Sequence, residues 1–105
     1  MKKLHFMGIG GQGISAVAQM VLEAEKNNVI VTGCDMQASA TTYALQEMGV
    51  PVQIGHSAEH LVGIDKLVVV PAALVLNPDH PELVTARVRG IPMITWQEML
   101  GELIR

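Results

Sequence analysis

Short apolar runs alternate with stretches of helical spacing along the whole 105-residue chain. This alternation is typical of a parallel sheet with helices on both faces, because parallel strands need crossover connections. The sequence predicts five strands, at residues 3–7, 29–31, 50–54, 67–70 and 91–94. Right-handed crossovers then favour a Rossmann-like, doubly wound α/β fold with strand order 3-2-1-4-5 and the first strand in the centre.

Helices are expected between these strands. Apolar residues at positions 14, 17, 18, 21 and 22 have the spacing of one helical face, and further helices are predicted over 39–48, from Pro81 to Gly90 and from Thr95 onward. Thr95-x-x-Glu98 is a capping box, and residues 56–61 are expected to form a helical turn. Pro51 favours an edge position for the third strand, because proline cannot donate to a strand ladder.

The first strand-to-helix junction is rich in glycine. Gly8-Ile9-Gly10-Gly11-Gln12-Gly13 matches G-x-G-x-x-G, and Asp35 closes the next strand 22 positions after Gly13. In such a junction the first glycine allows a tight turn, the second lets a phosphate approach the backbone, and the third lets the helix pack close to the strand. The helix start would face the anion, and Asp35 would accept a hydrogen bond from a ribose hydroxyl.

Composition excludes several classes of protein. A net charge of −3 argues against a nucleic-acid partner, and the apolar run at 67–76 is too short to cross a bilayer. Cys34 is the only cysteine, so a reducing compartment is expected. Residues 1–18 loosely imitate a signal peptide, but His5, Gln12 and the glycines interrupt the apolar stretch, and a cytoplasmic location is expected.

Other motifs carry little chemistry. Residues 56–60 match the H-x-x-E-H pattern of some zinc peptidases, but they lie between a strand and a short turn, so no metal site is expected. His5 is expected to be a packing residue of the first strand and Cys34 a buried side chain. The sequence shows no phosphate loop of the G-x-x-x-x-G-K-[ST] type and no catalytic triad. These observations favour a binding module without its own catalytic residues.

Five stretches together resemble the amino-terminal domain of the Mur ligase family, and within it the UDP-N-acetylmuramate–L-alanine ligases. They are HFMGIGGQGISAVA, VTGCDMQASATTYAL, IGHSAEHL, NPDHPELVTARVRGIPMI and EMLGELIR, in this order along nearly the whole chain. The resemblance implies a three-domain ligase: an amino-terminal UDP-binding domain, a central ATPase, and a carboxy-terminal domain that helps to hold the amino acid. Residues 1–105 would then be the first domain only.

The resemblance also implies the partners. The substrate would be UDP-N-acetylmuramate, and ATP and Mg²⁺ would act in the other two domains, where an acyl phosphate forms and the amine of L-alanine attacks it. This domain would bind no cofactor, metal, nucleic acid or membrane. Carried over by motif, the residues expected to contact the UDP-sugar are Gly8, Ile9, Gly10, Gly11, Gln12, Gly13, Cys34, Asp35, Met36, Thr42, His56, Ala72 and Ala73.

The chain departs from the family pattern at Pro71-Ala72-Ala73-Leu74, where a Ser-Ser-Ala-Ile type stretch is usual. Both hydroxyls are absent, and Pro71 also lacks an amide donor. Two alternatives therefore stay open. One is an NAD(P)-type dinucleotide-binding module, because Asp35 also suits an adenosine ribose. The other is a regulatory or interaction domain that keeps the fold without the ligand.

Overall fold

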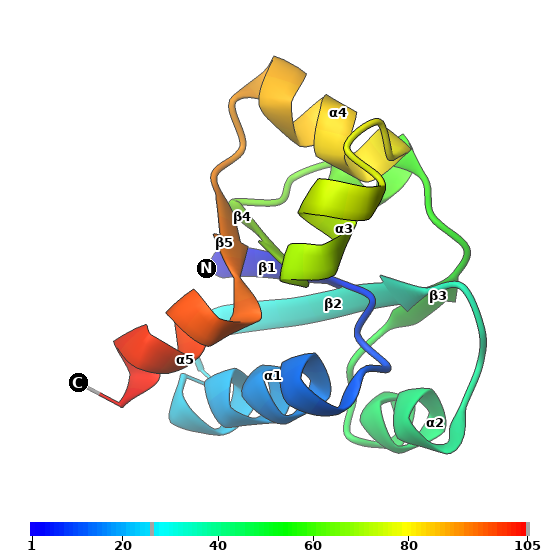
Figure 1. The fold of residues 1–105 in the computed structure, drawn as a ribbon. Coiled ribbons are helices and arrows are strands. Elements are labelled where there is room, and N and C mark those ends of the chain that lie inside the picture. Colours follow the sequence, from blue (N-terminus) through cyan, green and yellow to red (C-terminus); the bar gives the residue numbers. More distant parts are fainter. Residues whose placement is uncertain (26, 105) are drawn as a thin grey trace.

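The computed structural model describes residues 1–25 and 27–104, which contain one five-stranded, entirely parallel sheet of order β3-β2-β1-β4-β5 (Figure 1). The strands are β1 (Lys2–Met7), β2 (Val29–Asp35), β3 (Val52–Ile54), β4 (Lys66–Val69) and β5 (Met93–Thr95). The helices are α1 (Gln12–Ala24), α2 (Ala40–Glu47), the 3-10 helix η1 (Ala58–Leu61), α3 (Pro71–Leu76), α4 (Pro81–Arg89) and α5 (Trp96–Leu103). The predicted Rossmann-like topology is confirmed.

The register of the sheet brings the ends of the central strands together. Met7 at the end of β1 lies opposite Cys34 in β2, and Asp35 lies opposite Ile54 in β3. The carboxyl ends of β1, β2 and β3 therefore lie side by side, at one end of the strands. In doubly wound folds, ligands bind outside these carboxyl ends, where the strand order reverses.

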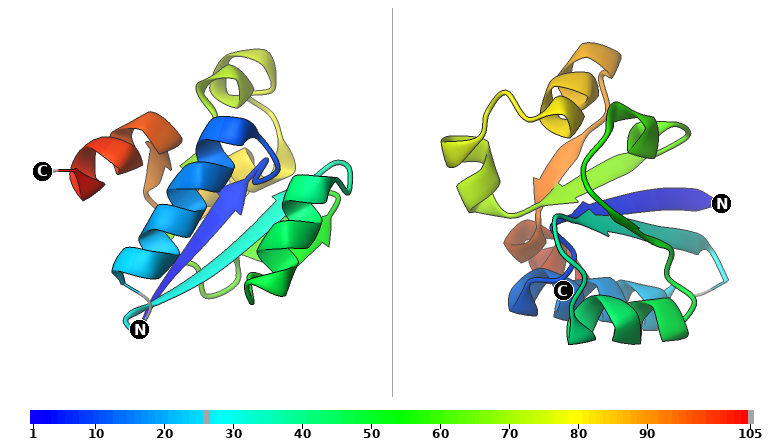
Figure 2. Two further views of the ribbon diagram at one scale, coloured as in Figure 1. Left: turned by 90° about the horizontal axis from the view of Figure 1, so that it is seen from below. Right: turned by 90° about the vertical axis from the view of Figure 1, so that its right-hand side faces the viewer.

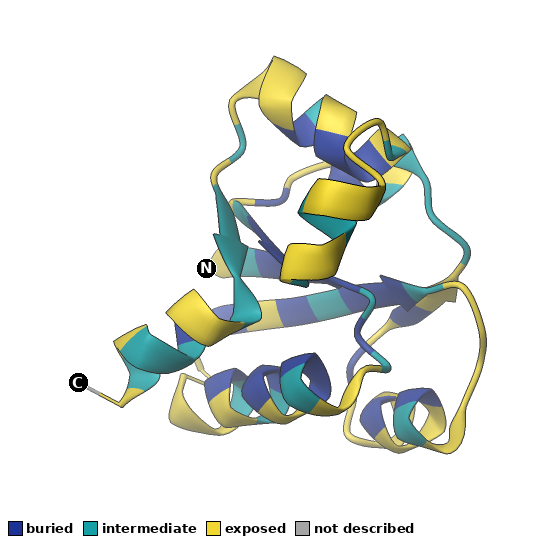
Figure 3. Cartoon of the chain, viewed as in Figure 1, coloured by how far each residue is buried: buried dark blue, intermediate teal, exposed yellow. Residues whose placement is uncertain are grey.

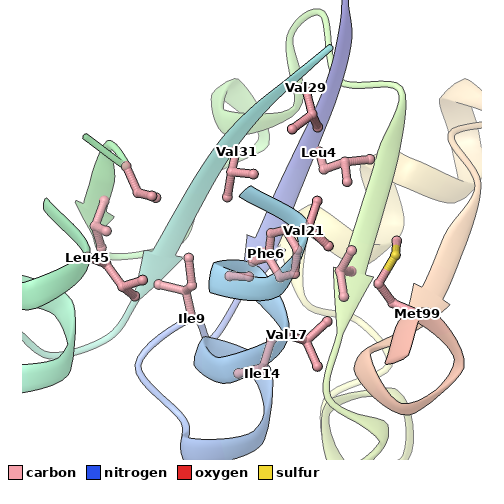
Figure 4. Close-up of a cluster of buried hydrophobic side chains, with 14 residues drawn as sticks. Leu4, Phe6, Ile9, Ile14, Val17, Val21, Val29, Val31, Leu45 and Met99 are labelled. Carbon is pink, nitrogen blue, oxygen red and sulfur yellow. The ribbon is translucent and has the colours of Figure 1, made fainter. Parts of the chain in front are cut away.

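Alternation along β1 separates two environments. Leu4 and Phe6 belong to an apolar core with residues of α1, α2 and α5, among them Val17, Leu45 and Met99 (Figure 4). The neighbouring positions His5 and Met7 face the other side, where η1 and α4 cover the sheet (Figures 1 and 2). The inner surfaces of α1 and α4 are buried and their outer surfaces are exposed (Figure 3).

Helix ends follow the expected signals. Gly90 is the left-handed C-cap of α4, with φ of 69°. The predicted capping box of Thr95 and Glu98 is present at the start of α5. A second box, between Ser39 and Thr42, begins α2.

Prolines shift two strand boundaries from their predicted positions. The third and fifth strands begin at residues 52 and 93, later than the expected 50 and 91. Pro51 and Pro92 come directly before them, and their carbonyls accept from Gly33 N–H (3.0 Å) and Leu67 N–H (2.9 Å). Because proline supplies an acceptor but no donor, each extends the ladder on one side only.

Helix α3 was not predicted from the sequence. The fourth strand, expected over 67–70, ends at Val69, and Pro71 begins a short helix for which the sequence patterns gave no prediction. Proline suits the first helical position, because its fixed φ fits the helix and its missing N–H would have no partner there. No helix in residues 1–25 and 27–104 is both long and apolar enough to cross a membrane.

Candidate functional site

The loop between β1 and α1 is pinned to the end of β2. The N–H groups of Gly8 and Ile9 both donate to the carbonyl of Cys34, at 2.9 and 3.0 Å, and Gly11 N–H donates to Gly8 O at 3.1 Å. Gly8 has φ of 78°, so the expected role of this glycine in a tight turn is confirmed. Ile9 is fully buried, and its side chain belongs to the apolar core.

The first amides of α1 have no acceptor among the described residues; Gln12 is exposed and Gly13 half-buried, whereas Ile14 is buried. The first helical bond runs from Ser15 N–H to Gly11 O (3.0 Å), and within the described residues the N–H groups of Gln12, Gly13 and Ile14 donate to no carbonyl or side chain outside the helix. The first amides of an α-helix have no acceptor inside it and carry its positive dipole end. This place can therefore hold an anion.

Gly10, in the loop before these amides, is bonded to Asp35 at the end of β2. Asp35 Oδ2 accepts from Gly10 N–H at 2.8 Å, and Asp35 Oδ1 lies 3.4 Å from Gln37 N. A Cβ on Gly10 would lie 2.7 Å from Asp35 Oδ2 and 3.2 Å from Thr42 Cγ2. The absence of a side chain at Gly10 thus allows the carboxylate to reach the glycine loop.

Gly13 differs from its expected role. A Cβ on Gly13 would lie 2.6 Å from Trp96 ring carbons, so this glycine makes room for α5 and not for a strand. The G-x-G-x-x-G pattern could not predict the contact of Gly13 with Trp96, because Trp96 lies 83 positions away in the sequence.

A cleft of about 640 Å³ opens beside Asp35 at the ends of β2 and β3. Met36, Gly55 and His56 line one side, and residues 76–81, between α3 and α4, line the other. Met36 is exposed, whereas His56 is half-buried. Two of the predicted contact residues, Met36 and His56, therefore share one cleft.

Of the other predicted contact residues, Thr42 and Cys34 are buried, and their side chains bond to other residues of the protein. Thr42 is buried; its Oγ1 accepts from Ser39 N–H at 2.8 Å and donates to Ser39 O at 3.0 Å. Cys34 is fully buried beneath η1 and α4, as the sequence analysis expected. Ala72 and Ala73 lie on α3, the first exposed and the second packed against the α4 side.

Glu82 was not predicted as a site residue; it is a fully buried carboxylate in the first turn of α4. Its Oε1 lies 3.3 Å from His5 Nε2, and its Oε2 lies 3.2 Å from both His56 Nδ1 and His60 Nδ1. Cys34 Sγ donates to the same carboxylate at 3.2–3.3 Å. The only available signal was the position of these histidines and the cysteine on the same side of successive strands and turns.

Burial and hydrogen bonding shift the pKa values in this cluster. Burial raises the pKa of Glu82, but hydrogen bonds from His5 and Cys34 outweigh it and lower that pKa to about 2. Burial, followed by the charge of Glu82, raises the pKa of the Cys34 thiol well above its ordinary value. Burial and the neighbouring His56 lower the pKa of His80. A carboxylate is therefore held ionised inside the protein at neutral pH.

With this fold and site, the chain belongs to the Mur ligase family: the family model described as "Mur ligase family, catalytic domain" matches residues 3–105. Proteins named UDP-N-acetylmuramate–L-alanine ligase are among its relatives. The one from Dechloromonas aromatica is 41% identical over the whole chain, and the one from Chlorobium phaeobacteroides is 44% identical over 97% of it. The chain spans about a fifth of their length, 21% in both cases.

Solved structures share the fold. The UDP-N-acetylmuramate:L-alanyl-gamma-D-glutamyl-meso-diaminopimelate ligase from Neisseria meningitides superposes with a TM-score of 0.83, covering 97% of this chain and 31% of that one, at 27% identity. A murein peptide ligase from Psychrobacter arcticus gives the same TM-score at 21% identity, with 97% of this chain and 20% of that one covered, which shows the fold alone.

Proposed function

We propose that this domain binds the UDP portion of UDP-N-acetylmuramate. The observation that carries the proposal is the set of three amides without an acceptor among the described residues, those of Gln12, Gly13 and Ile14, beside the carboxyl end of β1; Gln12 is exposed and Gly13 half-buried. A diphosphate is a dianion with several acceptor oxygens, and a helix start offers both donors and a favourable dipole. Gly8, Ile9, Gly10 and Gly11 hold the loop in shape, since their own amides are already bonded.

The nucleoside would lie beside the diphosphate. Among the described residues, Asp35 Oδ1 has a single long contact, with Gln37 N at 3.4 Å, so this oxygen can accept from a ribose hydroxyl. The cleft next to Asp35 is lined by Met36 and His56 and is large enough for a uracil ring. Two residues would border the base, Ala72 and Ala73. Two buried residues, Cys34 and Thr42, would lie behind the walls of the cleft and support them.

We further propose that the chain acts as the first domain of an ATP-dependent ligase that joins L-alanine to this substrate, in the cytoplasm. The names of the relatives support this, and the chain spans about a fifth of their length. The ATPase and the carboxy-terminal domain, with ATP and Mg²⁺, would lie outside these 105 residues. The domain alone would bind substrate without turning it over.

Titration of the ¹⁵N-labelled chain with UDP-N-acetylmuramate tests the proposal. We expect the largest shifts at the amides of Gln12, Gly13 and Ile14, and smaller ones at Asp35 and His56. UDP alone should produce most of the same shifts, since the proposed contacts are with UDP. If millimolar ligand leaves the amides of residues 8–14 unmoved, the proposal is wrong.

A matched pair of carboxylates sharpens the test. Asp35 Oδ2 accepts from Gly10 N–H and Asp65 Oδ2 accepts from Lys3 N–H, both at 2.8 Å. Asp65, however, comes directly before β4 and lies at the amino ends of the strands. Asp35→Asn should weaken UDP binding, whereas Asp65→Asn should leave it unchanged. Saturable binding of NADH without a response to UDP would favour the dinucleotide-binding alternative.

A further inference from the structure

All four histidines of the chain gather around one buried carboxylate on the η1 and α4 side of the sheet. We propose that this cluster is a structural zinc site whose four ligands are His5, Cys34, His60 and Glu82. The site does not include the amides at the start of α1, and it meets the proposed UDP cleft through Cys34 and His56. One ligand comes from each of β1, β2, η1 and α4, so a bound ion would join these four elements.

The separations between donor atoms support the proposal. The four ligand atoms all lie within 4.8 Å of one another. His5 Nε2 is 3.3 Å from Cys34 Sγ and 3.3 Å from Glu82 Oε1, and His60 Nδ1 is 3.2 Å from Glu82 Oε2. Zinc bonds to nitrogen, oxygen and sulfur imply edges of about 3.4–3.6 Å in a regular tetrahedron. The measured separations are close to these edges, so small side-chain adjustments would complete that geometry.

The charge balance supports it as well. Glu82 is fully buried, and a carboxylate in the interior needs a counter-charge or hydrogen-bond donors close by. A zinc ion bound by one thiolate, one carboxylate and two neutral imidazoles has no net charge. The thiol of Cys34 would lose its proton to the solvent on binding, as zinc ligands do.

The carboxylate is crowded without an ion. Four groups lie within 3.2 Å of Glu82 Oε2: Cys34 Sγ, His56 Nδ1, Ser57 N and His60 Nδ1. An oxygen with two lone pairs cannot accept from all four. With zinc bound to Cys34 and His60, only Ser57 N–H and His56 need to donate to Glu82, and both then act as supports of a zinc ligand.

The second nitrogen of His5 has the partner that a zinc ligand requires. His5 Nδ1 lies 2.8 Å from Thr32 Oγ1, so donation to this hydroxyl leaves Nε2 free to bind the metal. A cavity of about 200 Å³, lined in part by His5 and His60, gives an ion access from the surface. The residue set contains no open coordination position, which is typical of structural and not catalytic zinc.

The experiment uses the 105-residue chain, purified with a chelator and then freed of it. Co²⁺ and Zn²⁺ are the probes. We expect one ion per chain by equilibrium dialysis, the intense visible bands of tetrahedral Co²⁺, and the near-ultraviolet charge-transfer band of a Co²⁺–thiolate bond. Zn²⁺ should displace Co²⁺ and raise the melting temperature. The absence of stoichiometric binding, or an octahedral Co²⁺ spectrum without the thiolate band, would overturn the proposal.

Variants separate this site from adventitious binding. Cys34→Ser should abolish the thiolate band, and His60→Asn, at a half-buried position, should weaken Zn²⁺ binding by at least about tenfold while circular dichroism stays native. Glu59→Gln is the matched control, because Glu59 belongs to the same H-x-x-E-H stretch but is exposed, and among the described residues its side chain has no hydrogen bond to the cluster. Equal Zn²⁺ affinity in His60→Asn and Glu59→Gln would show that His60 does not bind zinc and that hydrogen bonds alone hold the cluster, which would overturn the proposal.

Discussion

The indole ring of Trp96 occupies the space in which a side chain on Gly13 would stand. A Cβ built on Gly13 would lie 2.6 Å from the ring atoms Cη2 and Cζ2, closer than real Cβ atoms approach. The contact joins the start of α1 to the start of α5, and it depends on the smallest residue facing the largest.

Gly13→Ala should therefore destabilise the chain. The ring of Trp96 has to move out of its position, and overpacking of this kind costs roughly 1–3 kcal/mol. Urea unfolding measures the loss. Combining Gly13→Ala with Trp96→Leu should recover part of the loss caused by the alanine, because the smaller side chain leaves room for the new methyl group.

Gly101→Ala is the matched control for this prediction. Gly101 lies inside α5, and a Cβ added there would meet no atom within 4 Å. Alanine should stabilise the helix by up to about 1 kcal/mol, because glycine is the poorer helix former. Equal effects of the alanines at 13 and 101 would contradict the role of Trp96.

Gly10→Ala should affect ligand binding more than stability. The new methyl group would lie 2.7 Å from Asp35 Oδ2 and would push the half-buried carboxylate toward the solvent. If Asp35 accepts from the ribose, losing that charged hydrogen bond costs about 1.5–3 kcal/mol, or roughly tenfold or more in UDP affinity. Calorimetry measures the affinity, and unaltered UDP binding would show that Asp35 does not contact the ligand.

Thr42→Val should weaken α2. The hydroxyl of Thr42 accepts from Ser39 N–H and donates to Ser39 O, and valine keeps the shape but removes both bonds. Loss of such a cap costs about 1 kcal/mol in the free energy of unfolding. Thr41→Val is the control: its side chain is half-buried and takes no part in the capping box, so we expect a change within about 0.5 kcal/mol.

The capping box of α5 should give the chain a measurable acid dependence. Hydrogen bonds from the backbone N–H and the hydroxyl of Thr95 lower the pKa of Glu98. Because the folded-state pKa lies below the unfolded one, the stabilisation is complete above the unfolded-state pKa and is lost as pH falls through the folded-state value. A carboxyl NMR titration should give a depressed pKa for Glu98, and Thr95→Ala should return it toward the ordinary value.

Much of the fold could be predicted from local signals. The apolar strands, Gly90 after α4 and the Thr95–Glu98 box each act within a few residues of their own position, and all are confirmed. The short helix α3 was missed because Pro71 after an apolar strand is compatible with either a loop or a helix start.

The candidate site was predictable only where it depends on one loop. The turn at Gly8 follows from the glycine pattern, whereas Trp96 and Glu82 reach the site by packing of distant helices, which a local pattern cannot report. His56 was predicted to face a ligand; in the structure it lines the cleft and also contacts Glu82. Both the cleft and the contact with Glu82 depend on residues that are distant from His56 in the sequence.

The two chemically different faces of β1 also constrain how the chain can fold. A slip of one residue against β2 or β4 would carry the Phe6 ring into the surroundings of the Glu82 carboxylate and would move His5 into a core without polar partners. Sheets that are apolar on both faces tolerate such a slip more easily. In this chain a misregistered sheet would have two costs: an imidazole buried without polar partners, and a buried carboxylate without its hydrogen-bond donors. Both faces of the sheet therefore favour the same strand alignment.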